Sequence, residues 1–409
     1  MPAAAMNRSV LPRAVPADVG LDAQRLERLM AVLRADAERG RLPGGVALIA
    51  RHGRIALHEA FGVQSPAPTP VGHTPAPMRT DSLFRIYSMT KPIVSVAAMM
   101  LVERGQLLLS DPVHRFVPAF AATQVAVEQG GAVTLRAPAR PATVQDLLRH
   151  TAGLTYEFLG ASHVQRAYVQ ARMNSRERTN AELCDQLAAL PLMFDPGAVW
   201  EYSRATDVLG RVIEVAAGQT LGDMLRDEIF APLGMTDTAF RVPEAQWHRI
   251  AEPFAHDPDG GVPYKVFDPR VAARLELGGG GLMSTTRDYA RFLQMLLNRG
   301  ELDGVRLLSP ATVDFMTADH LGNIPIHGAL LPPGHGFGLG FAVRRSAGEA
   351  AVPGSVGLYY WGGIAGTTFF VDPAQDLFAM LMIQAPNQRD HYRELFRNLV
   401  YATLTETHR

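Results

Sequence analysis

One segment of the chain places a serine and a lysine at the start of a helix that is expected to be buried on every side. Residues 93–102 (IVSVAAMMLV) are almost uniformly apolar, which is typical of a helix packed all round rather than of a surface helix. Pro92 lacks a backbone N–H and would clash with the carbonyl four residues back, so the helix is expected to begin near Ser88. Lys91 follows Ser88 by three residues and therefore lies on the same helix face. Polar groups in so apolar a segment are costly unless they have a chemical task.

The lysine is itself rare in this chain. Lys and Arg together number 39, and only Lys91 and Lys265 are lysines, so the other 37 are arginines. Arginine stays charged at any working pH, whereas a buried or crowded lysine can lose its proton and act as a base. Free N–H groups at a helix N-terminus also favour developing negative charge. The pattern predicts that Ser88 is a nucleophile activated by Lys91, although an exposed turn with a solvated lysine is the alternative for Ser-x-x-Lys alone.

Composition excludes several classes of protein. The 409 residues are 47% hydrophobic and 19% charged with a formal net charge of −1, which fits neither a disordered chain nor a nucleic-acid-binding protein. The single cysteine, Cys184, excludes an internal disulfide. No run approaches the ~18 apolar residues of a membrane span, and residues 1–20 lack the apolar core of a signal peptide. We therefore expect a cytoplasmic protein with no membrane and no nucleic-acid partner.

Strand patterns occur at the two ends of the chain, with helical patterns between them. An amphipathic helix is expected to start at Asp22, and two short apolar runs, residues 46–50 and 55–60, predict a β-hairpin. Residues 390–404 predict a closing helix. Four short apolar segments bounded by glycine or Asp-Pro turns predict further strands, at residues 337–343, 358–361, 367–371 and 377–383.

This order of elements predicts an α/β plus α architecture in which one antiparallel sheet, flanked by helices, is formed from both chain termini. A mostly helical domain is inserted between the two parts. The expected boundaries are residues 1–78 with 287–409 for the sheet domain and residues 79–286 for the helical domain. A chain of 409 residues is long enough for two such units. The active site is expected at their interface.

Five motifs, spread over most of the chain, resemble those of one enzyme superfamily. They are Ser88-Met89-Thr90-Lys91, residues 147–154 (LLRHTAGL), residues 194–203 (FDPGAVWEYS), residues 278–286 (GGGGLMSTT) and residues 361–363 (WGG). In this order they resemble the motifs of the serine β-lactamase and penicillin-binding-protein superfamily. Within it the chain is similar to the class C-related esterases called family VIII. The resemblance implies a β-lactamase-like fold and a reaction through an acyl-enzyme.

The resemblance makes Tyr202 the third catalytic residue. It stands in the place of the tyrosine of the class C Tyr-x-Asn motif. A phenol beside an ammonium group can share a proton with it, so Tyr202 could take the proton of Ser88 and pass it to the leaving oxygen. Whether Lys91 or Tyr202 is formally the base stays open. A core tyrosine hydrogen-bonded to backbone is the structural alternative.

The resemblance also implies the groups that bind the substrate. The oxyanion of an acyl-transfer intermediate needs two preorganised donors, which are expected to be the backbone N–H groups of Ser88 and Ile364. Trp361, Gly362 and Gly363 are expected to line the substrate site. Two glycines weaken a strand unless something must approach its backbone closely. A β-bulge without function is the alternative interpretation of the glycine pair.

Two departures from the β-lactamase pattern bear on the substrate. They fall in what we call the second motif of the superfamily, here Tyr202-Ser203-Arg204, and the third motif, here Trp361-Gly362-Gly363. Trp361-Gly362-Gly363 replaces the usual Lys-Thr-Gly, whose cation and hydroxyl help hold the carboxylate of the antibiotic. Tyr202-Ser203-Arg204 lacks the asparagine that helps bind the amide side chain of a β-lactam. Both changes favour a short-chain or otherwise neutral carboxylic ester. The alternatives are a β-lactamase or D-amino-acid peptidase, an amide hydrolase, an acyltransferase, or an inactive binding or scaffold protein of the same fold.

Other site types lack their signatures in the sequence. There is no Gly-x-Ser-x-Gly elbow and no His-Glu-x-x-His zinc motif, and the glycine run at residues 278–281 is not followed by the lysine of a P-loop. We expect no metal and no cofactor, and a small-molecule ester as the partner. The sequence leaves the physiological substrate, acyl chain length, enantioselectivity and oligomeric state open.

Overall fold

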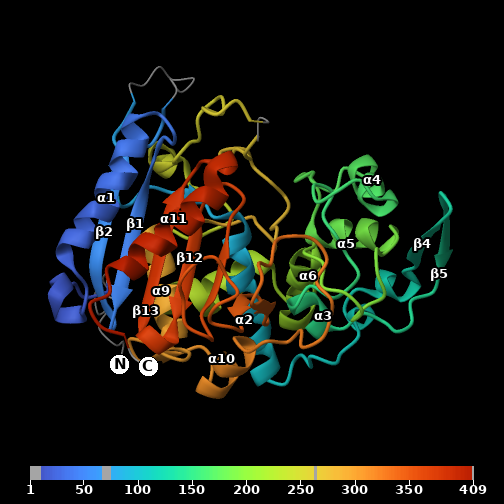
Figure 1. The fold of residues 1–409 in the computed structure, drawn as a ribbon. Coiled ribbons are helices and arrows are strands. Elements are labelled where there is room, and N and C mark those ends of the chain that lie inside the picture. The colour runs from blue at the N-terminus through green and yellow to red at the C-terminus, as the bar shows by residue number, and fades with distance from the viewer. Residues whose placement is uncertain (1–10, 67–74, 262–264, 408–409) are drawn as a thin grey trace.

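An antiparallel sheet built from both ends of the chain forms one side of the molecule (Figure 1). The computed structural model describes residues 11–66, 75–261 and 265–407. The seven strands have the order β2-β1-β13-β12-β11-β10-β9. They are β1 (Gly44–Arg51), β2 (Arg54–Gly62), β9 (His335–Phe337), β10 (Ala342–Arg344), β11 (Tyr359–Gly362), β12 (Thr368–Asp372) and β13 (Leu377–Ile383). The N-terminal hairpin pairs with the last strand, so the prediction of one sheet formed from both termini is confirmed.

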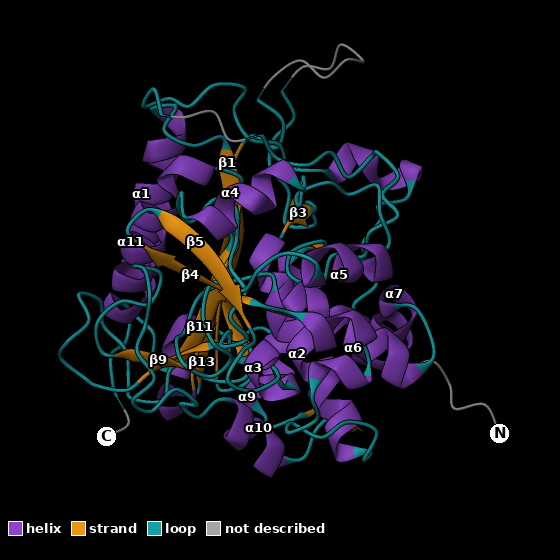
Figure 2. Ribbon diagram, turned by 90° about the vertical axis from the view of Figure 1, so that its right-hand side faces the viewer, coloured by secondary structure: helices purple, strands orange, loops and turns teal. Residues whose placement is uncertain are grey.

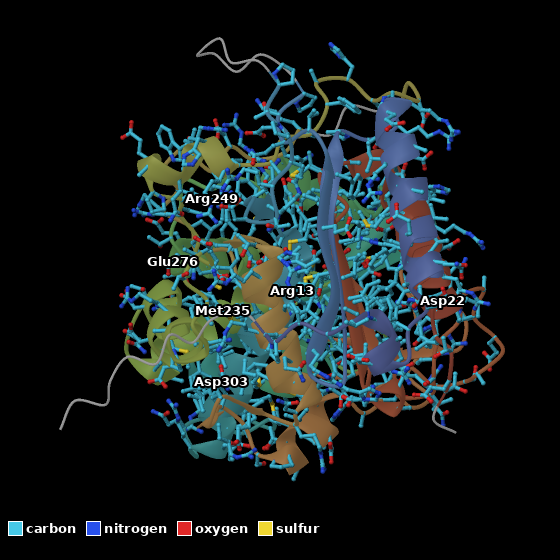
Figure 3. All side chains as sticks on the ribbon, turned by 90° about the vertical axis from the view of Figure 1, so that its left-hand side faces the viewer. Arg13, Asp22, Met235, Arg249, Glu276 and Asp303 are labelled. Atoms are coloured by element: carbon cyan, nitrogen blue, oxygen red, sulfur yellow. The ribbon has the colours of Figure 1, made fainter. Side chains whose placement is uncertain are left out.

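Helices cover both faces of this sheet. α1 (Ala23–Glu38) and α11 (Arg389–Ala402) pack together on one face, and α9 (Thr286–Leu297) lies on the other (Figure 3). Ala47 of β1 belongs to the apolar cluster under α1 and α11, whereas its neighbour Val46 belongs to the core on the opposite face. Because successive side chains alternate between two covered faces, β1 and β13 are buried along their whole length.

The first and last helices of the sheet domain lie where they were predicted from the sequence. Asp22, labelled in Figure 3, precedes α1, and its carboxylate accepts hydrogen bonds from the amides of Gln24 and Arg25 at 2.8 and 3.0 Å. An N-cap carboxylate of this kind satisfies amides that have no partner inside the helix. The closing helix α11 agrees with the predicted residues 390–404 to within two residues at each end.

A layer rich in helices lies beside the sheet (Figure 2). Its helices are α2 (Thr90–Glu103), α3 (Val144–Leu148), α4 (His163–Gln170), α5 (Asn180–Ala188), α6 (Ala205–Ala217), α7 (Leu221–Leu225) and α8 (Ala231–Leu233), and α10 (Pro310–Met316) follows α9. Three short strand pairs lie outside the seven-stranded sheet. They are β3 (Phe84–Arg85) with β6 (Met283–Ser284), β4 (Val125–Gln129) with β5 (Ala132–Arg136), and β7 (Glu301–Leu302) with β8 (Val305–Arg306).

The helix that contains Lys91 is buried as expected. Every residue of α2 from Thr90 through Leu101 is buried, and one apolar core continues from the sheet into the helical layer. The domain boundaries after residues 78 and 286 remain a prediction. Parts of the predicted sheet domain, residues 1–10, 67–74 and 408–409, lie outside the described residues.

One predicted strand is wrong. Residues 337–343 do not form a single strand, because β9 ends at Phe337 and β10 begins at Ala342, with a reversal between them. Gly340 in this reversal has φ 102°, which glycine adopts without steric cost. A β-carbon at Gly340 would also collide with the side chain of Ser95 in α2. The glycine therefore lets the hairpin turn tightly against the buried helix.

Arg51 joins the two ends of the chain at one end of β1. Its side chain is fully buried. The guanidinium donates hydrogen bonds of 3.0–3.3 Å to four backbone carbonyl groups, those of Val19, Gly20, Gln375 and Glu406. A buried arginine that binds carbonyl groups from both termini stabilises the closure of the sheet domain.

Replacing Arg51 by methionine is expected to lower the free energy of unfolding by about 3 kcal/mol, because four carbonyl groups lose a charged donor. Denaturation in urea, followed by circular dichroism, measures the change. Arg39→Met is the control, since the Arg39 side chain is 67% exposed and its loss should change stability by less than about 0.5 kcal/mol. Equal stability of wild type and Arg51→Met would contradict the role given to this guanidinium.

Candidate active site

Ser88 lies in a tight turn at the entrance of α2. Residues Tyr87–Met89 form a single 3₁₀ turn, and α2 follows at Thr90, close to the start predicted from the sequence. Tyr87 has φ 43°, a left-handed conformation that is rare for a bulky residue. Its hydroxyl accepts a hydrogen bond of 3.1 Å from the amide of Phe267. Backbone held in a sparsely populated conformation next to a reactive side chain is typical of functional sites.

Lys91 is buried against Ser88. The Lys91 side chain is fully inaccessible, and its Nζ lies 3.4 Å from the Ser88 Oγ. Nζ also donates hydrogen bonds to the Tyr156 hydroxyl at 3.0 Å and to the Gly279 carbonyl oxygen at 2.7 Å. The amine is thus held by oxygen atoms from three separate parts of the chain. The exposed, solvated lysine that was the alternative interpretation is not what the structure shows.

Tyr202 lies in the same cluster, although its hydroxyl points to another partner. The Lys91 Nζ is 4.6 Å from the centroid of the Tyr202 ring, so the amine contacts the face of the phenol. The Tyr202 hydroxyl accepts a hydrogen bond of 3.2 Å from the indole Nε1 of Trp361. The structure therefore brings Ser88, Lys91 and Tyr202 together, with the lysine between the serine and the ring.

Tyr156 is a site residue that the analysis of the sequence missed. It follows the motif of residues 147–154 by only two positions, which was the available signal. Its side chain is nearly buried, and its hydroxyl is a hydrogen-bond partner of the Lys91 amine. Burial, together with the nearby charge of Asp207, holds the pKa of Tyr156 well above its ordinary value. Tyr156 is therefore a neutral phenol that orients Lys91.

The glycine run of residues 278–281 passes directly beside the lysine. While the Gly279 carbonyl accepts from Lys91, its amide donates to the Asp207 carboxylate at 2.6 Å. A β-carbon on Gly279 would come within 2.5 Å of that carboxylate, so this position has no room for a side chain. The glycine run is therefore a tight backbone passage beside Lys91.

A buried ion-pair network holds this passage in place. Asp207 pairs with Arg204 at 3.2 Å, and Arg204 pairs with Glu157 at 2.6 Å. Burial acts to lower the pKa of Arg204, but the two carboxylates outweigh it and raise that pKa above its ordinary value. Arg204, in the second motif, is therefore a permanently charged group whose charge is already matched by two carboxylates.

The third motif lies at the end of β11, against the chain that leads into Ser88. A β-carbon on Gly363 would come within 2.5 Å of the Ile86 carbonyl oxygen, so the two backbones are in close contact. Trp361 is 7% exposed, and its ring packs against those of Tyr202 and Phe337. The sheet thus contributes Trp361-Gly362-Gly363 to the same place as the catalytic candidates of the helical layer.

His150 packs against the ring of Tyr202. Its imidazole is fully buried, its centroid is 4.9 Å from that of Tyr202, and its Nδ1 is 3.2 Å from the Ser203 Oγ. Burial, with a smaller contribution from the charge of Lys91, holds the pKa of His150 well below its ordinary value. The ring is therefore neutral at physiological pH and packs as an aromatic group.

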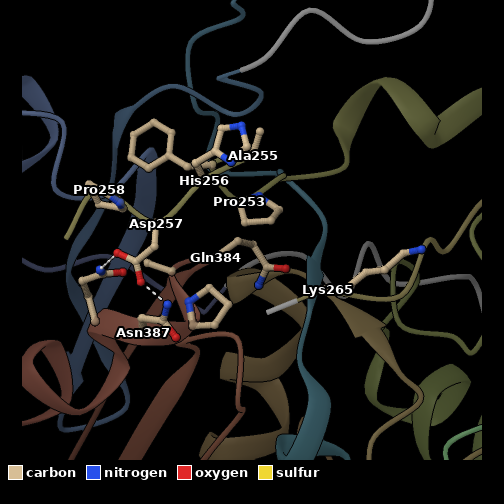
Figure 4. Close-up of a pocket in the computed structure, with 12 residues that line it drawn as sticks. Pro253, Ala255, His256, Asp257, Pro258, Lys265, Gln384 and Asn387 are labelled. Atoms are coloured by element: carbon tan, nitrogen blue, oxygen red, sulfur yellow. Dashed lines mark hydrogen bonds between the residues drawn. The ribbon is translucent and has the colours of Figure 1, made fainter. Parts of the chain in front are cut away.

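A surface pocket lies close to the segment that leads into Ser88 (Figure 4). It is lined by residues 253–258, Lys265 and residues 384–388. The side-chain amide of Gln384 donates a hydrogen bond of 3.3 Å to the carbonyl of Arg85, three residues before Ser88. The wall of this pocket is thus tied to the strand that enters the nucleophile turn.

The described residues contain neither a cluster suited to a metal ion nor a membrane-spanning helix. In residues 11–66, 75–261 and 265–407, no group of three or more His, Cys, Asp or Glu side chains is placed to hold a metal ion. In the same ranges, no helix is long and apolar enough to cross a membrane.

An antiparallel sheet beside a helical layer, with a Ser-x-x-Lys turn where they meet, is the architecture expected of the serine β-lactamase-like enzymes. The Beta-lactamase family model matches residues 24–402. The chain belongs to this family, and both the superfamily and the fold predicted from the motifs are confirmed.

Similar proteins include esterases and acyltransferases. Esterase EstB of Burkholderia gladioli is 35% identical over 393 residues, which cover 90% of this chain and 92% of EstB. The solved structure of EstCE1, described as a hydrolase with promiscuous acyltransferase activity, has a TM-score of 0.78 at 28% identity and covers 92% of this chain and 98% of EstCE1. The simvastatin synthase LovD of Aspergillus terreus has a TM-score of 0.77 at 25% identity and covers 93% and 98% of the two chains.

Replacing Tyr156 by phenylalanine is expected to slow the reaction of Ser88 with a fluorophosphonate probe about tenfold, because Lys91 loses a partner that orients it. The second-order rate constant of labelling, followed by intact mass, measures the effect. Tyr359→Phe is the matched control, since Tyr359 is buried and its hydroxyl has no hydrogen-bond partner among the described residues. Labelling of Tyr156→Phe at the wild-type rate would show that Lys91 is oriented without this phenol.

Proposed function

We propose that the protein is a serine hydrolase that cleaves short-chain or otherwise neutral carboxylic esters through an acyl-enzyme on Ser88, and that it belongs to the branch of the family called family VIII esterases. The observation that carries the proposal is the buried Lys91 amine, 3.4 Å from the Ser88 hydroxyl in a family of serine enzymes. A relative 35% identical over 90% of the chain is named an esterase, which supports the reaction class. The protein is accordingly a carboxylic ester hydrolase.

The first half-reaction acylates the serine. The Ser88 Oγ attacks the ester carbonyl carbon, and its proton passes to the pair formed by Lys91 and Tyr202. The tetrahedral oxyanion is stabilised by the N–H groups of Ser88 and Ile364. Collapse of the intermediate breaks the bond to the alcohol oxygen, which leaves with the proton held by the pair.

The second half-reaction reverses these roles. A water molecule gives a proton to the Lys91 and Tyr202 pair and attacks the acyl carbon, and the proton returns to the Ser88 Oγ as the acid leaves. The indole N–H of Trp361 lies 3.2 Å from the Tyr202 oxygen, where it would stabilise a phenolate during either step. The arrangement is therefore consistent with Lys91 or Tyr202 as the formal base.

The environment of the site supports a neutral substrate. Trp361 offers an aromatic face, and its one N–H donor is already used by Tyr202, so the third motif presents no cation to a carboxylate. Arg204 in the second motif is paired with Glu157 and Asp207, so its charge is not free for a substrate. We propose a small-molecule ester as the partner, with no nucleic acid, membrane or cofactor, and a cytoplasmic location.

Acyl transfer is the second candidate function. EstCE1 is described as a hydrolase with promiscuous acyltransferase activity, whereas LovD is described only as a simvastatin synthase. The two reactions share the acyl-enzyme and differ only in whether water or an acceptor alcohol attacks it. Added alcohol that diverts the acyl group from water would support this candidate.

The first test compares turnover of p-nitrophenyl butyrate and nitrocefin by wild type and Ser88→Ala. We expect strong ester turnover that falls at least about 10³-fold in Ser88→Ala, because the nucleophile is lost, and little nitrocefin cleavage. Ser95→Ala is the matched control, since Ser95 is a buried serine of α2, the helix that follows Ser88, and its loss should leave the chemical step intact.

Other results would redirect the assignment. Nitrocefin turnover as fast as ester turnover would contradict the substrate argument from Trp361. Ester turnover that survives in Ser88→Ala would contradict the nucleophile. If neither substrate turns over but a fluorophosphonate probe labels Ser88, the acyltransferase becomes the better assignment, and absence of labelling would point to an inactive scaffold.

A further inference from the structure

Arg393 reaches from α11 to the peptide group that follows Gly363. α11 lies across one face of the sheet (Figure 1), and the Arg393 Nη2 donates a hydrogen bond of 2.6 Å to the Gly363 carbonyl oxygen. That carbonyl and the N–H of Ile364 belong to one peptide unit. The guanidinium therefore binds the carbonyl oxygen of the peptide group whose N–H, in the proposed function, donates to the oxyanion.

We infer that Arg393 is a positioning residue that orients the Gly363–Ile364 peptide and strengthens the Ile364 N–H as an oxyanion donor, an inference that rests on the proposed function. A charged donor on a carbonyl draws electron density from the whole peptide group, so the N–H of that group becomes a better donor. The same hydrogen bond resists rotation of the peptide, which keeps the N–H aimed in one direction.

Arg393 has one carboxylate partner among the described residues. Its carboxylate partner, Asp390, is 3.1 Å from the Nη1, but the Asp390 side chain is 71% exposed and is screened by solvent. The Arg393 Nε is buried, and no described residue accepts a hydrogen bond from it. Burial lowers the pKa of this guanidinium below its ordinary value. Although its side chain is 28% exposed, the guanidinium is directed to one backbone group among the described residues, the Gly363 carbonyl.

Gly362 and Gly363 each occupy a position where a side chain would clash, but the clashing groups differ. A β-carbon on Gly362 would come within 2.8 Å of both the Nε and the Nη2 of Arg393, whereas one on Gly363 would meet the Ile86 carbonyl. Gly362 thus leaves the space through which the guanidinium reaches Gly363. Because the clash at Gly362 involves only the end of a flexible side chain, Gly362→Ala should push the guanidinium away without unfolding the strand.

The test measures Arg393→Met against wild type in two ways. With p-nitrophenyl butyrate, kcat is expected to fall about tenfold, less than the roughly 100-fold cost of losing an oxyanion donor outright, while KM stays within about twofold. In the acyl-enzyme formed from a slowly deacylating ester with an isotope-labelled carbonyl, the infrared stretch of that carbonyl is expected to move to higher frequency, because the N–H donor is weaker.

Three further variants separate this role from packing. Arg393→Lys should recover part of both effects, since it keeps a charged donor. Arg397→Met is the matched control one helical turn later, where the guanidinium stacks on the rings of Tyr360 and Phe370, and it should change neither readout. Gly362→Ala should reproduce the effects of Arg393→Met, and the double variant should be no worse than either alone.

The inference is overturned if folded Arg393→Met keeps the wild-type kcat and carbonyl frequency, if only KM changes, or if Arg397→Met has the same effect. Should Arg393→Met fail to fold, an unchanged carbonyl frequency in Gly362→Ala overturns it instead. If the wild-type protein shows no ester turnover that depends on Ser88, the proposed function is refuted instead. The two failures are therefore distinguishable.

Discussion

The burial of the Lys91 amine is the interaction on which the rest of the site depends. A lysine removed from water needs oxygen partners, and here they come from the Ser88 turn, from Tyr156 and from the Gly279 carbonyl. Each partner is fixed in turn: the glycine run is held by Asp207, and the serine turn is held by the conformation of Tyr87. The helical layer therefore holds the Lys91 amine against the Ser88 hydroxyl.

The sheet contributes the indole of Trp361 and the backbone at Gly363 to the site. The indole of Trp361 donates to the Tyr202 hydroxyl, so a strand and a loop of the helical layer share one hydrogen bond at the centre of the site. Gly363 brings the strand backbone against Ile86, and Arg393 binds the same backbone from the far side. The strand end is thus held between the nucleophile turn and α11, which supports the proposal that its backbone stabilises an oxyanion.

Much of the fold could be read from the sequence because its signals were local. The hairpin near the N-terminus, the first helix and the buried α2 followed from periodicity and capping, and each was found. The strand expected over residues 337–343 was not, because its apolar pattern does not reveal that Gly340 reverses the chain against Ser95. Tyr156 was missed although it follows the motif of residues 147–154 by two positions, because that position does not indicate that its hydroxyl meets Lys91.

By itself the sequence determined that Ser88 and Lys91 face the same way, because three residues of helix fix that geometry whatever surrounds them. Tertiary structure alone decided the other partners of Lys91, Tyr156 at a separation of 65 residues and Gly279 at 188. It also decided that Trp361 donates to Tyr202 across 159 residues. Contacts at such separations depend on how the sheet packs against the helical layer, and no local pattern of residue types encodes them.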